Sequence, residues 1–272
     1  MAMARLGDIM KYDYGFIGAG NMGSALSKAL KGPTVAVSNR TPEKAEALAS
    51  AIGATATTNA DIAENSRYIV LGVKPQMLPV LIDEIREDIS PDAVLVTMAA
   101  GIKMSTLCEM VGREQSVIRI MPNTPVAAGA GNILVAKNSK VRSENLETFI
   151  SDFASAGELL EMDEDMIDAA SVISGCGPAY SFMFFDALAK AGESLGLSYD
   201  MAKDLALSTV KGSAFFARKS DLSLDQLKVN VCSPGGSTIE GVKVFENENL
   251  DEIVTKALRA AYDRTLELSK GE

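Results

Sequence analysis

Two glycine-rich turns, one near each end of the 272-residue chain, carry the residue types best suited to binding anions. The first, "GAGNMG", places glycines at Gly18, Gly20 and Gly23, and the second, "SPGGST", spans 233–238. Both precede segments with a helical pattern, and the free backbone N–H groups at the start of a helix bind anions. The chain therefore predicts two anion sites, and their surroundings indicate different ligands.

The first turn has the context of a dinucleotide site. It follows the apolar run "YGFI" and opens the helical pattern "NMGSALSKAL", so GxGxxG falls in the first strand–turn–helix unit. In such a unit Gly18 permits the tight turn, Gly20 lets a pyrophosphate approach the backbone, and Gly23 lets helix and strand pack closely. The alternative, a tight turn without a ligand, explains the glycines but not this placement.

The residues after the next predicted strand indicate which dinucleotide binds. Folds that prefer NAD place an acid there, on the ribose 2′-hydroxyl, whereas this chain has Ser38, Asn39, Arg40 and Thr41. A guanidinium and two hydroxyls bind a 2′-phosphate, which an acid would repel. We therefore expect NADPH, with NADH as the second candidate. The alternative is that Arg40 only extends into solvent.

Loops at further predicted strand ends complete the expected cofactor groove. Parallel strands end at the ligand crevice, and "GVKP", "MAAG" and "MPNTP" occupy such ends, with Asn59 expected on the adenosine side. The predicted cofactor contacts are Gly18, Gly20, Asn21, Met22, Gly23, Ser38, Asn39, Arg40, Asn59, Val73, Lys74, Pro75, Ala99, Ala100 and Gly101.

The second turn suits a smaller anion. Ser233, Ser237 and Thr238 add hydroxyl donors to the backbone N–H groups of a helix expected to begin near Ile239. Because no lysine or arginine lies inside the turn, a carboxylate fits better than a phosphate. The alternative is a helix cap and tight turn with no ligand.

The elements that must position the first turn form an α/β domain. Up to residue 163, apolar runs such as "TVAVSNR", "RYIVLGVKP" and "AVLVTMAAG" alternate with helical patterns. Continuous apolar strands between helices indicate a parallel sheet covered on both faces. We predict a doubly wound, mostly parallel Rossmann domain over 1–163, with "NILVAKN" and "GELLEMD" extending its sheet.

The elements around the second turn are predicted to be helices. Over 164–272 the apolar residues recur at helical spacing, and Asn249 with Glu252 predicts a capping box at the start of the last helix. The methionine and phenylalanines of "SFMFF" are expected in a core or subunit interface. So many apolar stripes would be buried by a second copy, and we expect an all-α domain that forms a homodimer or larger oligomer.

Composition excludes several classes of function. The formal charge of −10 argues against nucleic acid and anionic membranes as partners. The chain has no histidine, so no mechanism can use an imidazole of this chain. Three cysteines without CxxC predict no metal site and a reducing, cytoplasmic location. We find no uninterrupted apolar run long enough to span a bilayer and no secretory signal.

Five motifs, in this order and spacing, are similar to those of one enzyme family. "FIGAGNMGSAL", "GVKPQ", "MPNTP", "SGCGPAY" and "VCSPGGSTIEG" resemble the pyrroline-5-carboxylate reductase family, and the resemblance covers about residues 14–268. It implies reduction of pyrroline-5-carboxylate to proline by NADPH or NADH, the last step of proline synthesis. It also implies an N-terminal Rossmann domain and a helical C-terminal domain that dimerises and often builds larger rings.

The resemblance also implies roles for residues. Thr238 and Glu164 match catalytic positions, the first near the ring nitrogen and the second favouring the cationic iminium. The residues that match substrate-binding positions are Asn230, Ser233, Gly236, Ser237 and Thr238. Because an iminium can take its proton from water, this chemistry needs positioning rather than a strong acid. Cys176, Cys232 and Val229 depart from the usual residues, which leaves the roles of those side chains open.

Two other functions stay open at this point. A β-hydroxyacid dehydrogenase would share the architecture, but it needs a lysine acid/base, and Lys190 and Lys211 lie outside a matching glycine-rich helix motif. A non-catalytic NADP-binding protein would share the fold without the reaction. Turnover of the cyclic imine would indicate the reductase, turnover of 3-hydroxy acids the dehydrogenase, and turnover of neither the non-catalytic binding protein.

Overall fold

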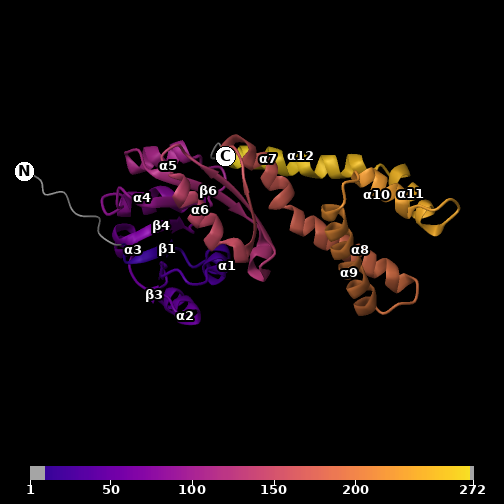
Figure 1. Ribbon diagram of the computed structural model, residues 1–272, viewed down its shortest axis with the longest axis horizontal. Helices are drawn as coiled ribbons and strands as arrows, with labels where there is room; N and C mark the ends of the chain where they lie inside the picture. The colour runs from indigo at the N-terminus through magenta and orange to yellow at the C-terminus, as the bar shows by residue number, and fades with distance from the viewer. Residues whose placement is uncertain (1–9, 270–272) are drawn as a thin grey trace, which may run out of the picture. The chain divides into compact units, whose positions relative to one another are not determined.

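The computed structural model describes residues 10–269, which form two compact units (Figure 1). The first contains the described residues up to Cys176 together with those from Tyr262 onward, and the second is Gly177–Ala261. The domain boundary expected at residue 163 falls inside the first unit and stays a prediction.

The first unit is built on an eight-stranded sheet in the order β3-β2-β1-β4-β5-β6-β7-β8. All neighbours are parallel except β6 and β7, which are antiparallel. The mostly parallel, doubly wound sheet expected from the sequence is therefore confirmed, including its extension by the last two strands. The strands are β1 Tyr12–Ile17, β2 Val35–Ser38, β3 Thr55–Ala56, β4 Ser66–Leu71, β5 Val94–Thr97, β6 Ser116–Pro122, β7 Gly131–Lys137 and β8 Gly157–Glu161.

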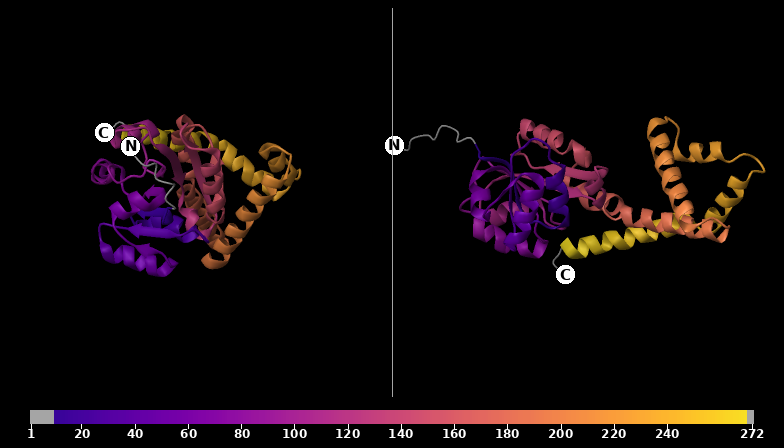
Figure 2. Two further views of the ribbon diagram at one scale, coloured as in Figure 1. Left: turned by 60° about the vertical axis from the view of Figure 1, so that its left-hand side comes forward. Right: turned by 90° about the horizontal axis from the view of Figure 1, so that it is seen from below.

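Helices cover both faces of this sheet (Figure 2). One core cluster joins the sheet to α3, α4, α5 and α7, and another joins it to α1 and α6. The helices are α1 Asn21–Ala29, α2 Pro42–Ile52, α3 Asn59–Asn65, α4 Leu78–Ile85, α5 Met104–Val111, α6 Ser143–Asp152 and α7 Glu164–Ser174, with short 3-10 helices η1 Pro75–Met77, η2 Thr124–Ala128 and η3 Ala154–Ala156. Alternate residues of β4, β5 and β7 enter opposite clusters, which explains their continuous apolar runs.

The register of the sheet brings the strand ends to one level. Ile17, the last residue of β1, pairs with Ser38 and with Leu71, the last residues of β2 and β4. Leu71 pairs with Thr97, the last residue of β5, and Thr97 pairs with Arg119 in β6. The loops after β1, β2, β4 and β5 therefore leave the sheet side by side, where ligands of such folds bind.

The second unit consists of helices, as the sequence predicts. They are α8 Gly177–Ser194, α9 Tyr199–Lys219, α10 Leu224–Val231, α11 Ser237–Asn247 and α12 Leu250–Ser269, of which α12 continues into the first unit. Small residues let α8 and α9 pack closely, since Gly192 lies against Ala202, and Ala189 and Ala206 are buried. The short helix α10 was not predicted.

Two helix starts differ from the sequence prediction. Helix α11 begins at Ser237 with Gly236 as its N-cap, two residues before the expected start. The predicted capping box is wrong. Asn249 has φ +54°, and the Glu252 N–H donates to the Asn249 backbone carbonyl at 3.0 Å rather than to the Asn249 side chain. The Glu252 carboxylate instead pairs with Lys256 at 2.7 Å.

Large apolar side chains of the second unit are exposed. Phe182 is 61% exposed and Met183 is 72% exposed, so these "SFMFF" side chains are not core within this unit. By length and composition alone, Glu164–Ser194 is the one helical stretch of residues 10–269 that could cross a membrane, which differs from the expectation of no such segment. Its first part is α7, whose Ile167 is buried against the sheet.

A buried tyrosine anchors β1 on the α6 face of the sheet. Tyr14 stacks on Tyr68 with ring centroids 4.7 Å apart, and its hydroxyl donates to Asp152 Oδ2 at 2.8 Å. Burial raises the pKa of the Tyr14 hydroxyl well above its usual range, and the hydrogen bond to Asp152 raises it further. The hydroxyl therefore stays protonated and continues to donate.

We predict that Tyr14→Phe lowers the free energy of unfolding by about 1–2 kcal/mol, because Asp152 loses its buried donor. Thermal unfolding measures this as a fall in Tm of a few degrees. Tyr199→Phe is the matched control, since Tyr199 donates to Asp186 at 2.8 Å in an exposed pair; its effect should stay within about 0.5 kcal/mol. Equal losses in the two variants would contradict the role assigned to burial.

Candidate cofactor and substrate sites

The first glycine-rich turn packs so closely on the next strand end that side chains would not fit. Gly18 has φ +110°, and a Cβ there would lie 2.7 Å from the Gly72 carbonyl oxygen. A Cβ on Gly23 would lie 2.6 Å from the Gly18 oxygen. These approaches hold the start of α1 against the ends of β1 and β4, as expected of a dinucleotide turn.

The start of α1 leaves room and donors for an anion. Gly20 is the N-cap residue, so no side chain caps the helix, and a Cβ at Gly20 would meet open space. The first turn of α1 contains no acidic residue. Its N–H groups and the positive end of the helix dipole are therefore available to a diphosphate. The glycine cradle fits the dinucleotide that the sequence predicts.

Hydrogen bonds join the loop after β2 to the glycine turn. Asn39 Oδ1 accepts the Ala19 N–H at 3.1 Å, and Asn39 Nδ2 donates to the Thr41 carbonyl at 3.0 Å. Arg40 lies between Asn39 and Thr41 in the sequence, and its side chain is exposed. Among residues 10–269 we find no ion-pair partner for Arg40, so its guanidinium is available to a ligand.

The residues predicted to lie on the adenosine side form a second chain of hydrogen bonds. The Ser38 hydroxyl donates to Asn59 Oδ1 at 2.6 Å, and Asn59 Nδ2 donates to Glu84 Oε1 at 3.0 Å. Asn59 is the first residue of α3, whose N-cap Thr58 accepts the Asp61 N–H. The orientation of the Asn59 amide is thus set on both sides.

The loops after β4 and β5 lie at the same sheet edge. Val73, Lys74 and Pro75 lead into η1, whereas Ala99, Ala100 and Gly101 lead into α5. The structure therefore brings the predicted cofactor residues together along the ends of β1, β2, β4 and β5. Their contacts with a cofactor stay predictions.

Glu164 belongs to a charged cluster beside the β5–α5 loop. Its Oε1 accepts the Met104 N–H at 2.7 Å and lies 3.6 Å from a terminal nitrogen of Arg119. Arg119, only 1% exposed, also pairs with Asp168 at 2.6 Å. No described contact uses Glu164 Oε2, and the side chain borders an open crevice of about 630 Å³. The carboxylate is thus anchored by one oxygen.

The predicted substrate residues other than Glu164 lie in the second unit. Gly235 has φ +72°, and the Gly236 N–H donates to the Ser233 carbonyl at 2.9 Å, which closes the turn before α11. Ser237 and Thr238 occupy the first turn of α11, and both are exposed. No side chain caps this helix start. Its donors can therefore bind a small carboxylate.

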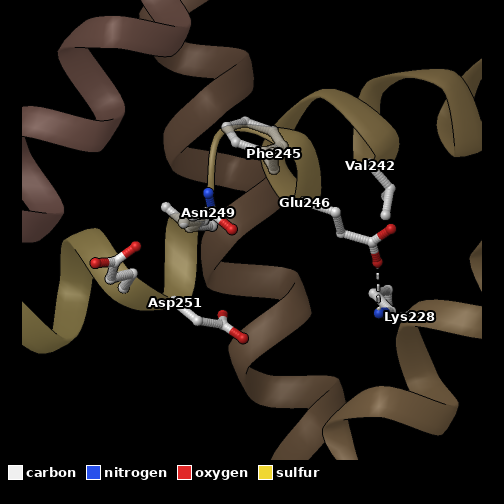
Figure 3. A pocket seen from close by; sticks show the side chains of 8 residues that line it. Lys228, Val242, Phe245, Glu246, Asn249 and Asp251 are labelled. Carbon is white, nitrogen blue, oxygen red and sulfur yellow. Dashed lines mark hydrogen bonds and ion pairs between the residues drawn. The ribbon is translucent and has the colours of Figure 1, made fainter.

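Asn230 lies on α10, and its Oδ1 accepts from Gln226 Nε2 one helical turn earlier, at 3.2 Å. A separate cavity of about 530 Å³ lies among α10, α11 and α12 (Figure 3). Lys228 reaches Glu246 there at 3.1 Å, and Val242, Phe245, Asn249 and Asp251 line the rest. None of the predicted substrate residues lines this cavity.

The sequence did not predict that Arg119 and the Met104 N–H, at the start of α5, contact Glu164. The available signal was a lone arginine in the apolar strand "SVIRIMPN", because a buried guanidinium requires carboxylate partners. Cys176 and Cys232 are half-buried free thiols. In the described part of the chain we find no cluster of acidic or cysteine side chains arranged to hold a metal ion.

Two known families match separate parts of the chain. The family described as pyrroline-5-carboxylate reductase dimerisation matches residues 164–268. The family described as NADP oxidoreductase coenzyme F420-dependent matches residues 13–101.

Two relatives that match over nearly the whole chain are named pyrroline-5-carboxylate reductase. A pyrroline-5-carboxylate reductase of Pisum sativum is 36% identical, covering 95% of this chain and 96% of the relative. The enzyme of Escherichia coli strain K12 is 34% identical, covering 96% of this chain and 100% of its own.

Solved structures agree with these relatives. The Plasmodium falciparum pyrroline carboxylate reductase with NADP bound matches with a TM-score of 0.85 and 31% identity, covering 96% of this chain and all of that one. A 3-hydroxyisobutyrate dehydrogenase of Mycobacterium tuberculosis, 15% identical over 70% of this chain with a TM-score of 0.50, shares the fold alone. The dehydrogenase alternative is not favoured, and the chain belongs to the pyrroline-5-carboxylate reductase family.

Proposed function

We propose that this chain reduces pyrroline-5-carboxylate to proline with NADPH, with NADH as the second donor. One observation carries the proposal: relatives named for this activity match the chain over nearly its whole length. The reduction adds a hydride to the imine carbon and leaves the nitrogen protonated as an amine, while the dinucleotide is oxidised.

The residues of the first unit bind the dinucleotide, which supplies the hydride when bound. Gly18, Gly20 and Gly23 form the backbone cradle, and the α1 N–H groups bind the diphosphate. Asn21 and Met22 line the start of α1, and Ser38, Asn39 and Asn59 surround the adenosine ribose. The loops 73–75 and 99–101 contact the rest of the cofactor.

Arg40 selects the 2′-phosphate. Its side chain is exposed at the ribose end, and Asn39 fixes its backbone through the Ala19 and Thr41 contacts. A guanidinium binds phosphate through paired charge-assisted hydrogen bonds, which a 2′-hydroxyl cannot match.

The turn before α11 binds the substrate carboxylate. Ser233, Gly236 and Ser237 contribute backbone and hydroxyl donors, and Asn230 lies on the preceding helix. The Thr238 hydroxyl hydrogen-bonds the ring nitrogen. Neutral donors at a helix start bind the carboxylate without a cation, which suits a chain with a formal charge of −10.

Glu164 stabilises the cationic iminium through the carboxylate oxygen that Met104 and Arg119 leave unused. The iminium takes its proton from water, so the mechanism requires no histidine. What the site contributes is mainly the alignment of the imine carbon with the hydride donor, and alignment of this kind lowers barriers by several kcal/mol.

The second unit also mediates self-association. It lies within the region matched by the dimerisation family, and its apolar side chains are exposed in a single copy. We propose a homodimer or a larger ring that works in the cytoplasm, with no nucleic acid or membrane as partner. Burial of side chains such as Phe182 and Met183 drives the association.

The activity is tested by following NADPH absorbance with purified protein. Oxidation of NADPH with pyrroline-5-carboxylate, and formation of proline in equal amount, supports the reductase. Reduction of NADP with 3-hydroxy acids would support a dehydrogenase instead, and absence of turnover with bound NADPH would leave a binding protein.

Thr238→Ala should lower kcat/KM for the imine about tenfold to a hundredfold, because a hydrogen bond to a charged substrate is lost. The Kd for NADPH should stay within about twofold, since the turn before α11 does not bind the dinucleotide. Thr238→Ser retains the hydroxyl and should restore most of the rate. If Thr238→Ala lost NADPH binding while its imine kinetics were unchanged, the assignment of Thr238 to the substrate site would be wrong.

Arg40→Ala should weaken NADPH binding about tenfold while NADH binding changes little, because only NADPH carries the 2′-phosphate. Cofactor fluorescence measures both dissociation constants. Lys44→Ala is the matched control, since it removes an exposed cation from the adjacent helix α2. If NADPH and NADH weaken equally in Arg40→Ala, the guanidinium does not read the phosphate.

A further inference from the structure

Arg119 is a buried charged residue on an interior strand of the sheet. It lies on β6 between Thr97 of β5 and Ala136 of β7, and its side chain is 1% exposed. A buried guanidinium is strongly unfavourable unless carboxylates compensate it. Helix α7 supplies two of them, Glu164 and Asp168, one helical turn apart and each 19% exposed.

The two carboxylates differ in what else they hold. Glu164 Oε1 accepts the N–H of Met104, the first residue of α5, whereas the Asp168 carboxylate makes no described hydrogen bond to that helix. Next to this contact, Asp165 pairs with Lys103, the N-cap residue of α5, at 3.0 Å. The first turn of α7 therefore binds the start of α5 through a hydrogen bond and an ion pair, and Arg119 connects that first turn to the sheet.

The segment between β5 and α5 is held at both ends. At the β5 end, Thr97 Oγ1 accepts the Ala99 N–H at 3.3 Å. At the α5 end, Glu164 binds the Met104 N–H, an N–H that has no partner within its own helix. Between these points Gly101 has φ +75°. This segment contains Ala99, Ala100 and Gly101, which are assigned to the cofactor.

We propose that Arg119 and Glu164 are positioning residues that hold the β5–α5 loop in the conformation that binds the dinucleotide. The proposal rests on the proposed function, because the loop matters only if the cofactor contacts it. Releasing the Met104 N–H would let the loop adopt other conformations. The apparent affinity then falls in proportion to the fraction of molecules with a competent loop.

Four variants test this by the Kd for NADPH, measured by cofactor fluorescence without imine. Glu164→Ala removes the acceptor and should weaken NADPH binding about tenfold, the scale of one charge-assisted hydrogen bond. Glu164→Gln keeps an acceptor oxygen and should stay within about threefold of wild type. Arg119→Lys cannot span both carboxylates and should weaken binding as Glu164→Ala does.

Asp168→Asn is the matched control, because it disturbs the same arginine and the same helix without touching α5. It should lower Tm at least as much as Glu164→Ala and leave the Kd for NADPH within about twofold. Equal loss of affinity in Asp168→Asn and Glu164→Ala would overturn the proposal, since general loosening of α7 would then explain both. Unchanged affinity in Glu164→Ala would also overturn it.

Hydrogen exchange of the segment 98–107 gives a second readout if Glu164→Ala fails to fold. Exchange should be faster in Arg119→Lys than in wild type and unchanged in Asp168→Asn; the same rate in all three would overturn the proposal. Wild type that binds no NADPH would defeat the proposed function itself. Wild type that reduces the imine while all variants keep their NADPH affinity would defeat only the positioning role.

Discussion

The fold of the first unit depends on the close backbone approach between the turn after β1 and the end of β4. Gly18 and Gly72 meet with no space for a Cβ on either, and Gly23 brings α1 equally close to the same turn. Because the strand register places the ends of β2, β1, β4 and β5 at one level, this contact fixes where four loops emerge. The predicted cofactor residues come from loops far apart in sequence, and this contact together with the strand register brings them to one edge of the sheet.

The proposed chemistry places few demands on ionisable groups. The chain has no histidine and a formal charge of −10, so the site depends on backbone amides, hydroxyls and a few well-placed charges. Arg119 supplies one of those charges where water does not reach it, and two carboxylates of α7 neutralise it. A buried ion pair of this kind adds little net stability. Its geometry is nevertheless strictly defined, because loss of one partner leaves an uncompensated buried charge, and this suits a contact that must hold a loop in place.

The sheet was predictable because its apolar runs, turn glycines and helical periods agree over the first half of the chain. The local departures have separate causes. Helix α10 is short, Gly236 starts α11 earlier than its apolar residues indicate, and Asn249 adopts a left-handed conformation that no side-chain pattern announces. The candidate sites were predicted from motifs and stay predictions, whereas the partners of Arg119 required the structure, since sequence does not reveal which carboxylates lie above a strand.

The division of labour at the dinucleotide site has a consequence for protein engineering. Backbone atoms of the first glycine-rich turn form the part that would hold the diphosphate. A side chain added at Gly18 would collide with the Gly72 carbonyl, and one added at Gly23 would collide with the Gly18 carbonyl. The predicted ribose end is instead made of side chains at residues 38–41, where Arg40 is exposed to solvent. Libraries that randomise this loop can therefore redirect the enzyme between phosphorylated and unphosphorylated coenzymes while the catalytic scaffold is inherited unchanged.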